Sequence, residues 1–193
     1  MSIRGSRARD EQLRLVARVV AAFVSISFVA AFFRPSVLFS WHPACMATGY
    51  LLLMTEGLLR AAEFRPLEKL PRVHAIQRHG WVQGAALLLL IMGYAAIYLN
   101  KERLDKPHLT SYHSKFGLAT TLLALGSAMG GLLSFRKLGL ISFFPDHMHA
   151  SIKAAHRAAG ALTWVLSLVT IELGMLHPVA AKGVMPPIWQ LSV

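Results

Sequence analysis

Five long apolar runs alternate with polar segments along the chain. They cover about residues 13–33, 38–59, 79–99, 113–134 and 156–176. A helix rises about 1.5 Å per residue, so about 20 apolar residues cross the roughly 30 Å of hydrocarbon in a bilayer. Each run is long enough. The pattern therefore predicts an all-α integral membrane protein, a multi-pass bundle of five transmembrane helices.

The segments outside these runs are short. The run 13–33 is longer than the apolar part of a typical signal peptide, and no small-residue cleavage site follows it, so we expect a retained membrane anchor. Residues 177–193 are too short, and too interrupted by prolines, to form a sixth span. We therefore expect residues 1–12 and the tail 177–193 to lie on opposite sides of the membrane.

The charges show which side is which. The chain has only 15% charged residues but a formal net charge of +11, and most basic residues fall on the side of the N-terminal segment. The positive-inside rule then predicts a cytoplasmic segment 1–12 and a non-cytoplasmic tail 177–193. The same distribution makes the basic excess a topology signal, so we expect no nucleic-acid partner. The residues on the cytoplasmic side are Arg4, Arg7, Arg9, Arg14, Arg60, Arg65, Lys69, Arg72, Arg78, Arg136, Lys137, Lys153 and Arg157.

Four of the nine histidines lie one per apolar run, near the start of the second to fifth runs. Consecutive spans are antiparallel, so the level of these histidines alternates. His42 and His113 are expected near the non-cytoplasmic face, and His79 and His156 near the cytoplasmic face. The other five are expected in loops: His74, His108, His147, His149 and His177.

Two level-matched histidine pairs indicate a redox centre. In a four-helix core each pair can face across the bundle, as the two axial ligands of a b-type haem do. A six-coordinate iron of this kind leaves no site for oxygen and favours electron transfer. The single cysteine, Cys45, excludes an intrachain disulfide or a thiolate metal cluster within the chain.

Glycines follow three of the histidines on the same helix face. Gly117 and Gly160 lie four residues after His113 and His156, and Gly49 lies seven residues after His42. A glycine there leaves room for a flat macrocycle. Two alternatives remain open: interfacial histidines with their ring tips in water, and glycines that serve close helix packing.

The second run opens with a helix disruptor, Pro43, directly after His42. We expect Ser40 to cap this helix, which would leave Pro43 in the first turn, where no backbone hydrogen bond is lost.

The ordered histidine motifs resemble the cytochrome b561 family. The similar stretches are Trp41-His42-Pro43 with Met46 and Gly49, residues 108–114 (HLTSYHS) with Gly117, and His156-Arg157 with Gly160. The run Met54-Thr55-Glu56 and the pair Lys101-Glu102 are similar to the short animal subgroup of cytochrome b561 domain-containing proteins. The resemblance covers about residues 13–176.

The resemblance implies cofactors, partners and an activity. Two non-covalent b haems would be held by His42 with His113 and by His79 with His156. The chain would be a transmembrane ascorbate-dependent oxidoreductase, which passes electrons from cytoplasmic ascorbate to monodehydroascorbate radical or ferric chelates on the far side. A vesicle or endoplasmic reticulum membrane and a homodimer are the expected setting.

The chain departs from the family pattern in two ways. Members usually have six spans, so five suggest a truncated isoform or an incomplete gene model. Many ascorbate-using members have a lysine or arginine two residues before the third-helix histidine, where this chain has Gln77. Other residues are the substrate candidates: Arg72, Arg78 and Lys153 on the cytoplasmic side, and Lys106 and His108 on the far side.

Two rival functions remain open at this stage. One is the cytochrome b anchor subunit of a quinone-linked complex, which would need a soluble partner. The other is a non-enzymatic membrane protein, such as a metal transporter whose path is lined with histidines.

Overall fold

The chain folds into helices joined by short connections. The computed structural model describes residues 3–64 and 66–176, and these contain helices and no strand, which confirms the all-α prediction. The elements in order are α1 (Ile3–Phe32), α2 (Leu38–Met46), the π-helix η1 (Ala47–Met54), α3 (Thr55–Phe64), α4 (Lys69–Arg103), α5 (Tyr112–Ser134), the 3-10 helices η2 (Arg136–Leu138) and η3 (Leu140–Phe143), and α6 (Asp146–Met175). The predicted tail 177–193 lies outside the described residues.

Within the described residues, four helices are long and apolar enough to cross a membrane: α1 over residues 8–32, α4, α5 and α6. The predicted span 38–59 is composite. It consists of α2, η1 and α3, which have 9, 8 and 10 residues and follow one another without a break. The helical membrane bundle is thus confirmed, while the crossing of the composite segment stays a prediction.

Two helices begin earlier than the apolar pattern indicates. α4 begins at Lys69 and α6 at Asp146, about three turns before the predicted spans 79–99 and 156–176. Hydropathy marks only the part of a helix suited to lipid, whereas the backbone hydrogen bonds continue into the polar segment. His74, His147 and His149 therefore lie in helices, not in the loops that we expected.

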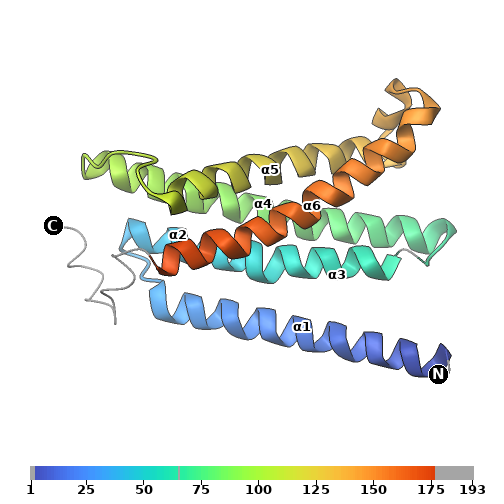
Figure 1. The fold of residues 1–193 in the computed structure, drawn as a ribbon, viewed down its shortest axis with the longest axis horizontal. Coiled ribbons are helices and arrows are strands. Elements are labelled where there is room, and N and C mark those ends of the chain that lie inside the picture. The colour runs from blue at the N-terminus through green and yellow to red at the C-terminus, as the bar shows by residue number, and fades with distance from the viewer. Residues whose placement is uncertain (1–2, 65, 177–193) are drawn as a thin grey trace.

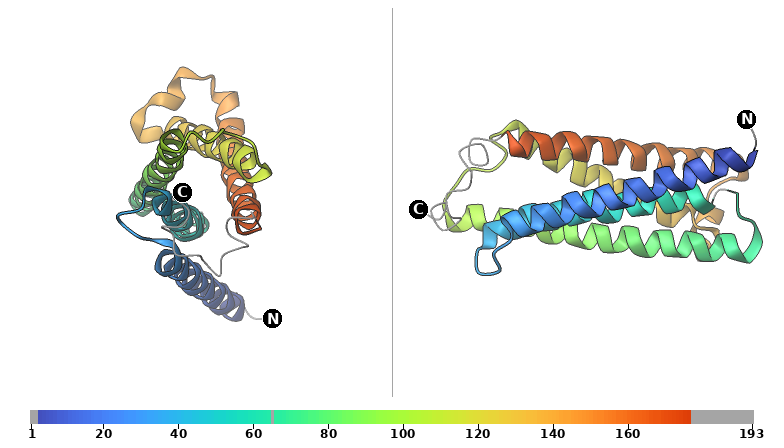
Figure 2. Two further views of the ribbon diagram at one scale, coloured as in Figure 1. Left: turned by 90° about the vertical axis from the view of Figure 1, so that its left-hand side faces the viewer. Right: turned by 90° about the horizontal axis from the view of Figure 1, so that it is seen from below.

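The helices run lengthwise side by side (Figure 1). The start of α1 and the α3–α4 and α5–α6 connections meet at one end, which we call the basic end. The α1–α2 and α4–α5 connections meet at the opposite end. Seen end-on, α1 lies outside the other helices and against the α2–η1–α3 segment (Figure 2).

The four-helix core consists of two halves. The α2–η1–α3 segment packs closely along α4, and α5 packs closely along α6, whereas the two halves share fewer contacts. Tyr50, Met54, Leu90 and Ala124 are buried where the halves meet, with Trp164 against them. The indole nitrogen of Trp164 donates a hydrogen bond of 2.9 Å to the Thr55 hydroxyl across the halves.

The expected cap of the second helix is wrong. α2 begins at Leu38, so Pro43 lies inside the helix and not in its first turn. Ser40 instead fastens the preceding connection: its hydroxyl oxygen lies 2.6 Å from the Arg34 carbonyl and 2.7 Å from the Val37 carbonyl, and accepts from the Arg34 N–H at 3.0 Å. Proline lacks the N–H that would bond to the carbonyl four residues earlier, and the π-helix begins four residues after it.

An ion-pair network ties α1 to α3. Arg18 lies within the first apolar run, and its guanidinium contacts Glu56 and Glu63, each at 2.7 Å. Glu56 also forms an ion pair with Arg60, with 2.7 Å between Oε1 and Nε. A lone charge in a membrane helix is costly, and these pairs balance the charge on the outermost helix.

We expect the ion-pair network to stabilise the packing of α1 against α3. We expect Arg18→Met to lower the free energy of unfolding by about 1 kcal/mol, since these pairs are partly exposed. For a chain of this size that is a fall of about 2–4 °C in the unfolding midpoint. Thermal unfolding in detergent measures it, with the exposed Arg9→Met as the matched control. Equal midpoints for the two variants would contradict a role for the network.

Candidate functional site

The structure places the four histidines of the spans in two pairs. The ring centres of His42 and His113 are 5.9 Å apart with an angle of 83° between the planes. Those of His79 and His156 are 6.4 Å apart at 82°. Each pair takes one ring from the α2–η1–α3 and α4 half and the other from the α5–α6 half. The first pair lies toward the opposite end and the second toward the basic end.

A backbone carbonyl fixes each ring. The Nδ1 atoms of His42 and His79 lie 3.0 and 2.8 Å from the carbonyls of Gly93 and Gly57. In the other half, the Nδ1 atoms of His113 and His156 each lie 2.9 Å from the carbonyls of Thr170 and Ser127.

Those contacts set the tautomer of each ring. A carbonyl oxygen only accepts, so Nδ1 carries the hydrogen and donates it. The neutral ring then has its lone pair on Nε2, the arrangement that metal-bound histidines use. In all four rings Nε2 is the nitrogen that remains available as a ligand.

The hydrogen bonds are reciprocal within each half. Every helical segment supplies one histidine and, further along, the carbonyl that holds its neighbour's histidine. In three segments the histidine and the carbonyl residue are 14 positions apart: His79 and Gly93, His113 and Ser127, and His156 and Thr170. In the fourth, His42 and Gly57 are 15 positions apart.

The π-helix accounts for the extra residue. A π-helix adds residues to a turn without ending the helix, and η1 (Ala47–Met54) lies between His42 and Gly57. The wider turn takes up the additional residue, so both groups reach their partners on α4. The extra residue between His42 and Gly57 therefore does not move either group away from its partner.

Two glycines that sequence reasoning missed contact the rings. A Cβ at Gly174 would lie 2.9 Å from Cε1 of His113, and a Cβ at Gly131 would lie 3.0 Å from Cε1 of His156. Each glycine lies four residues after the residue whose carbonyl accepts the ring's hydrogen bond, Thr170 or Ser127, and so on the same helix face one turn on. That spacing is the signal in the sequence that could have found them.

The three predicted glycines have different surroundings. Gly117 lines the space next to His113. A Cβ at Gly160 would lie 3.4 Å from the Ser127 hydroxyl, so it allows close contact with α5. A Cβ at Gly49 would lie 2.7 Å from the side chain of Leu90, so Gly49 faces α4 and not the space between the rings. This contact favours helix packing at Gly49, the alternative that the sequence left open for the glycines.

The separation of the rings fits an iron between them. Bonds from imidazole nitrogen to a metal are about 2 Å long, so two opposed ligands place their ring centres about 6 Å apart. Both pairs match this value. In the part of the chain that the structure describes, no group of three or more His, Cys, Asp or Glu residues could hold a metal ion.

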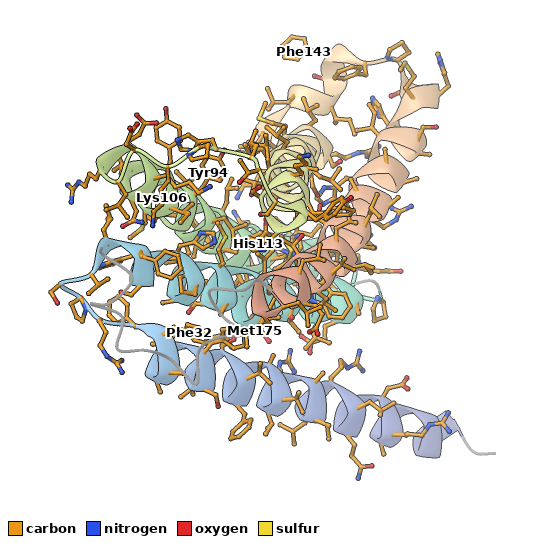
Figure 3. The ribbon with its side chains drawn as sticks, turned by 60° about the vertical axis from the view of Figure 1, so that its left-hand side comes forward. Phe32, Tyr94, Lys106, His113, Phe143 and Met175 are labelled. Atoms are coloured by element: carbon orange, nitrogen blue, oxygen red, sulfur yellow. The ribbon has the colours of Figure 1, made fainter. Side chains whose placement is uncertain are left out.

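A cavity of about 520 Å³ adjoins the pair at the opposite end. It extends from His42 and His113 to the α4–α5 connection, where Lys106 and His108 line it. Figure 3 shows that the side chains of the cavity come from several elements, while Phe143 lies apart from them. The labelled residues that line the cavity are Phe32, Tyr94, Lys106, His113 and Met175.

His108 is held at the mouth of this cavity. Its Nε2 lies 2.8 Å from a Glu102 carboxylate oxygen, and its ring stacks on Tyr98 with centres 4.6 Å apart. Lys101 donates to the carbonyl of Pro107 at 2.7 Å, which fastens the connection. The predicted pair Lys106 and His108 is thus brought together beside one ligand pair.

An open pocket of about 560 Å³ lies at the basic end. Its cations are Arg136, Lys153 and Arg157, and Arg72 lies near enough to interact with Lys153. Of the predicted substrate residues, Lys153 lines the pocket and Arg72 is close, whereas Arg78 is exposed and is not among the lining residues. Arg136 and Arg157 were missed because they were interpreted as topology signals, and Asp146 was missed because it was not considered as a site residue. His149, which also lines the pocket, was assigned to a loop.

Comparison with known proteins agrees with the geometry. The family model for eukaryotic cytochrome b561 matches residues 41–182. Transmembrane reductase CYB561D2 of Bos taurus is 34% identical over 187 residues, which cover 94% of this chain and 82% of the relative. Probable transmembrane reductase CYB561D1 of Mus musculus is 32% identical over 166 residues, 83% and 69% of the two chains.

A more distant relative is the lysosomal membrane ascorbate-dependent ferrireductase CYB561A3 of Bos taurus, 26% identical over 145 residues, which cover 72% of this chain and 51% of the relative. The family match covers well over half of the chain and includes all four paired histidines. The chain therefore belongs to the eukaryotic cytochrome b561 family and is, by that membership, a membrane oxidoreductase that binds b-type haem.

Proposed function

We propose that the chain carries electrons across a vesicle or endoplasmic reticulum membrane through two b-type haems. His79 and His156 hold one haem at the basic end, and His42 and His113 hold the other at the opposite end. The observation that carries the proposal is the pair of opposed imidazole sets, each with Nδ1 fixed by a carbonyl.

The protein residues position and tune the cofactors. A b haem between two imidazoles supplies a one-electron couple with no open coordination position. The four carbonyls orient the rings and raise the basicity of Nε2. Gly131 and Gly174 let the neighbouring helices approach the rings. The two ligand levels are 14 residues apart along a helix, or about 21 Å, which is much of the hydrocarbon thickness.

The basic end is the proposed donor side. Ascorbate is an anion at neutral pH, and the cations of the pocket favour it electrostatically. The positive-inside rule assigns this end to the cytoplasm. The bovine relative named as an ascorbate-dependent ferrireductase supports ascorbate as donor.

The opposite end is the proposed acceptor side. Its cavity connects the His42 and His113 pair with Lys106 and His108 at the surface. Monodehydroascorbate radical and ferric chelates such as citrate complexes are anionic, and Lys106 can attract them. The name of the same bovine relative supports ferric iron as one acceptor.

The proposed haems and the proposed donor can both be tested on the purified chain. We expect the purified chain to contain two low-spin b haems per polypeptide and to be reduced by ascorbate without a soluble partner. Pyridine haemochrome analysis with protein quantitation gives the count, and absorbance spectra follow reduction. A folded sample without haem would refute the assignment, and a requirement for a partner subunit would favour a quinone-linked anchor.

Double variants test which histidines share a haem. The double variant His79→Ala with His156→Ala should keep one haem, as should His42→Ala with His113→Ala, because each removes both ligands of one site. The mixed double variant His42→Ala with His79→Ala damages both sites and should lose both. Haem per polypeptide distinguishes the three. Retention of one haem by the mixed variant alone would show that the pairs are wrong.

The contact between Gly174 and the His113 ring can be tested by substitution. A methyl group at Gly174 would force the His113 ring to move, so we expect Gly174→Ala to weaken haem binding at the opposite end about tenfold, as changes next to metal-bound histidines do. Haem retention during dilution and the low-spin electron paramagnetic resonance signals measure the effect at each site.

The matched control is Gly126→Ala on α5, where a Cβ meets no atom within 4 Å. It should leave both signals unchanged. Identical spectra for Gly174→Ala and the control would remove Gly174 from the site.

A further inference from the structure

We propose that His149 accepts the proton that ascorbate releases when it gives up an electron in the basic-end pocket. This inference rests on the proposed function. It adds a residue that the ligand set and the cation cluster do not include.

The position of His149 fits this role. It lies in the first turns of α6 and lines the same pocket as Arg136, Lys153 and Arg157. Its side chain is only 12% exposed, so the ring is held by the protein and not free in solvent. It is seven residues before His156, two turns away along the helix.

The hydrogen bonds of His149 leave one nitrogen as a base. Nε2 lies 2.8 Å from the carbonyl of Phe144, which only accepts, so Nε2 carries the hydrogen of the neutral ring. Nδ1 then has the lone pair. It lies 3.4 Å from a carboxylate oxygen of Asp146. This is the reverse of the ligand histidines, in which Nδ1 donates and Nε2 is available.

Charged side chains share the pocket with the ring. Arg136 on η2 and Lys153 and Arg157 on α6 are cations, Arg72 on α4 lies near enough to interact with Lys153, and Asp146 supplies a carboxylate beside Nδ1. An ascorbate anion held by these cations would lie in the pocket that His149 lines.

The step balances in atoms and electrons. The ascorbate monoanion breaks one O–H bond, the proton forms an N–H bond at Nδ1 of His149, and the single electron would go to the b-type haem that His79 and His156 are proposed to hold. The product is the monodehydroascorbate radical, which remains a monoanion. Asp146, whose side chain is fully exposed, then accepts a hydrogen bond from Nδ1–H and leads the proton to water.

His149→Gln tests the step. Glutamine can still donate to the Phe144 carbonyl but cannot take up a proton. We expect the limiting rate of haem reduction at saturating ascorbate to fall about 100-fold, the lower range for general bases. The half-saturating ascorbate concentration and the rate with dithionite should stay unchanged. The control is His147→Gln, an exposed neighbour on the same helix. Stopped-flow absorbance measures the limiting rates of the wild type and of both variants.

Nitrogen NMR of histidine-labelled protein gives a readout without turnover. The neutral His149 ring, assigned in the wild type through its backbone resonances, should carry its proton on Nε2. A proton on Nδ1 would overturn the inference even if the variant failed to fold. Equal limiting rates for wild type and His149→Gln would overturn it while leaving the proposed function intact. A wild type that dithionite reduces and ascorbate does not would overturn both.

Discussion

The structure depends on four hydrogen bonds from histidine Nδ1 atoms to backbone carbonyls. Each bond lies within one half of the core, between antiparallel neighbours, and leaves Nε2 as the ring nitrogen available to a ligand. The two halves share fewer contacts with each other than the helices within each half do. The rings therefore meet where the two halves pack least closely. A group bound by the two Nε2 atoms of a pair would also hold the halves together. Cofactor binding and tertiary stability are coupled in such an arrangement.

The interval between a histidine and the carbonyl on its own helix sets the distance between the two ligand levels. Since both helices of a half use the same interval, each histidine meets its partner at the right height. Equal intervals in both halves are what a duplicated two-helix unit would give. The interval from His42 to Gly57 is 15 residues, one more than in the other helices. The wider turns of the π-helix between them compensate for the extra residue. π-Helices are frequent at functional sites, and register correction is a physical reason for one here.

The sequence was sufficient for the parts of the site that the membrane constrains. Antiparallel spans of similar length allow few arrangements, so the level of each histidine followed from its place in an apolar run, as for His42 and His113. The carbonyl partners could not be found in this way, because every residue has a carbonyl. Glycines were ambiguous for a similar reason: Gly49 and Gly174 both permit a close approach, and only the fold shows that one meets Leu90 and the other His113.

The basic residues were ambiguous for a deeper reason. Membrane insertion and anion binding both require positive charge at the same end of this protein, because the proposed donor is a cytoplasmic anion. Arg136, Lys153 and Arg157 meet both requirements at once, so no count of charges can separate the two roles. The fold separates them: Arg78 stays exposed, while these three converge on one pocket together with His149. At the opposite end, Glu102 beside His108 makes the surface mixed in charge. This mixed charge matches an anion less well than the cations of the basic end do, which supports the proposed placement of the donor.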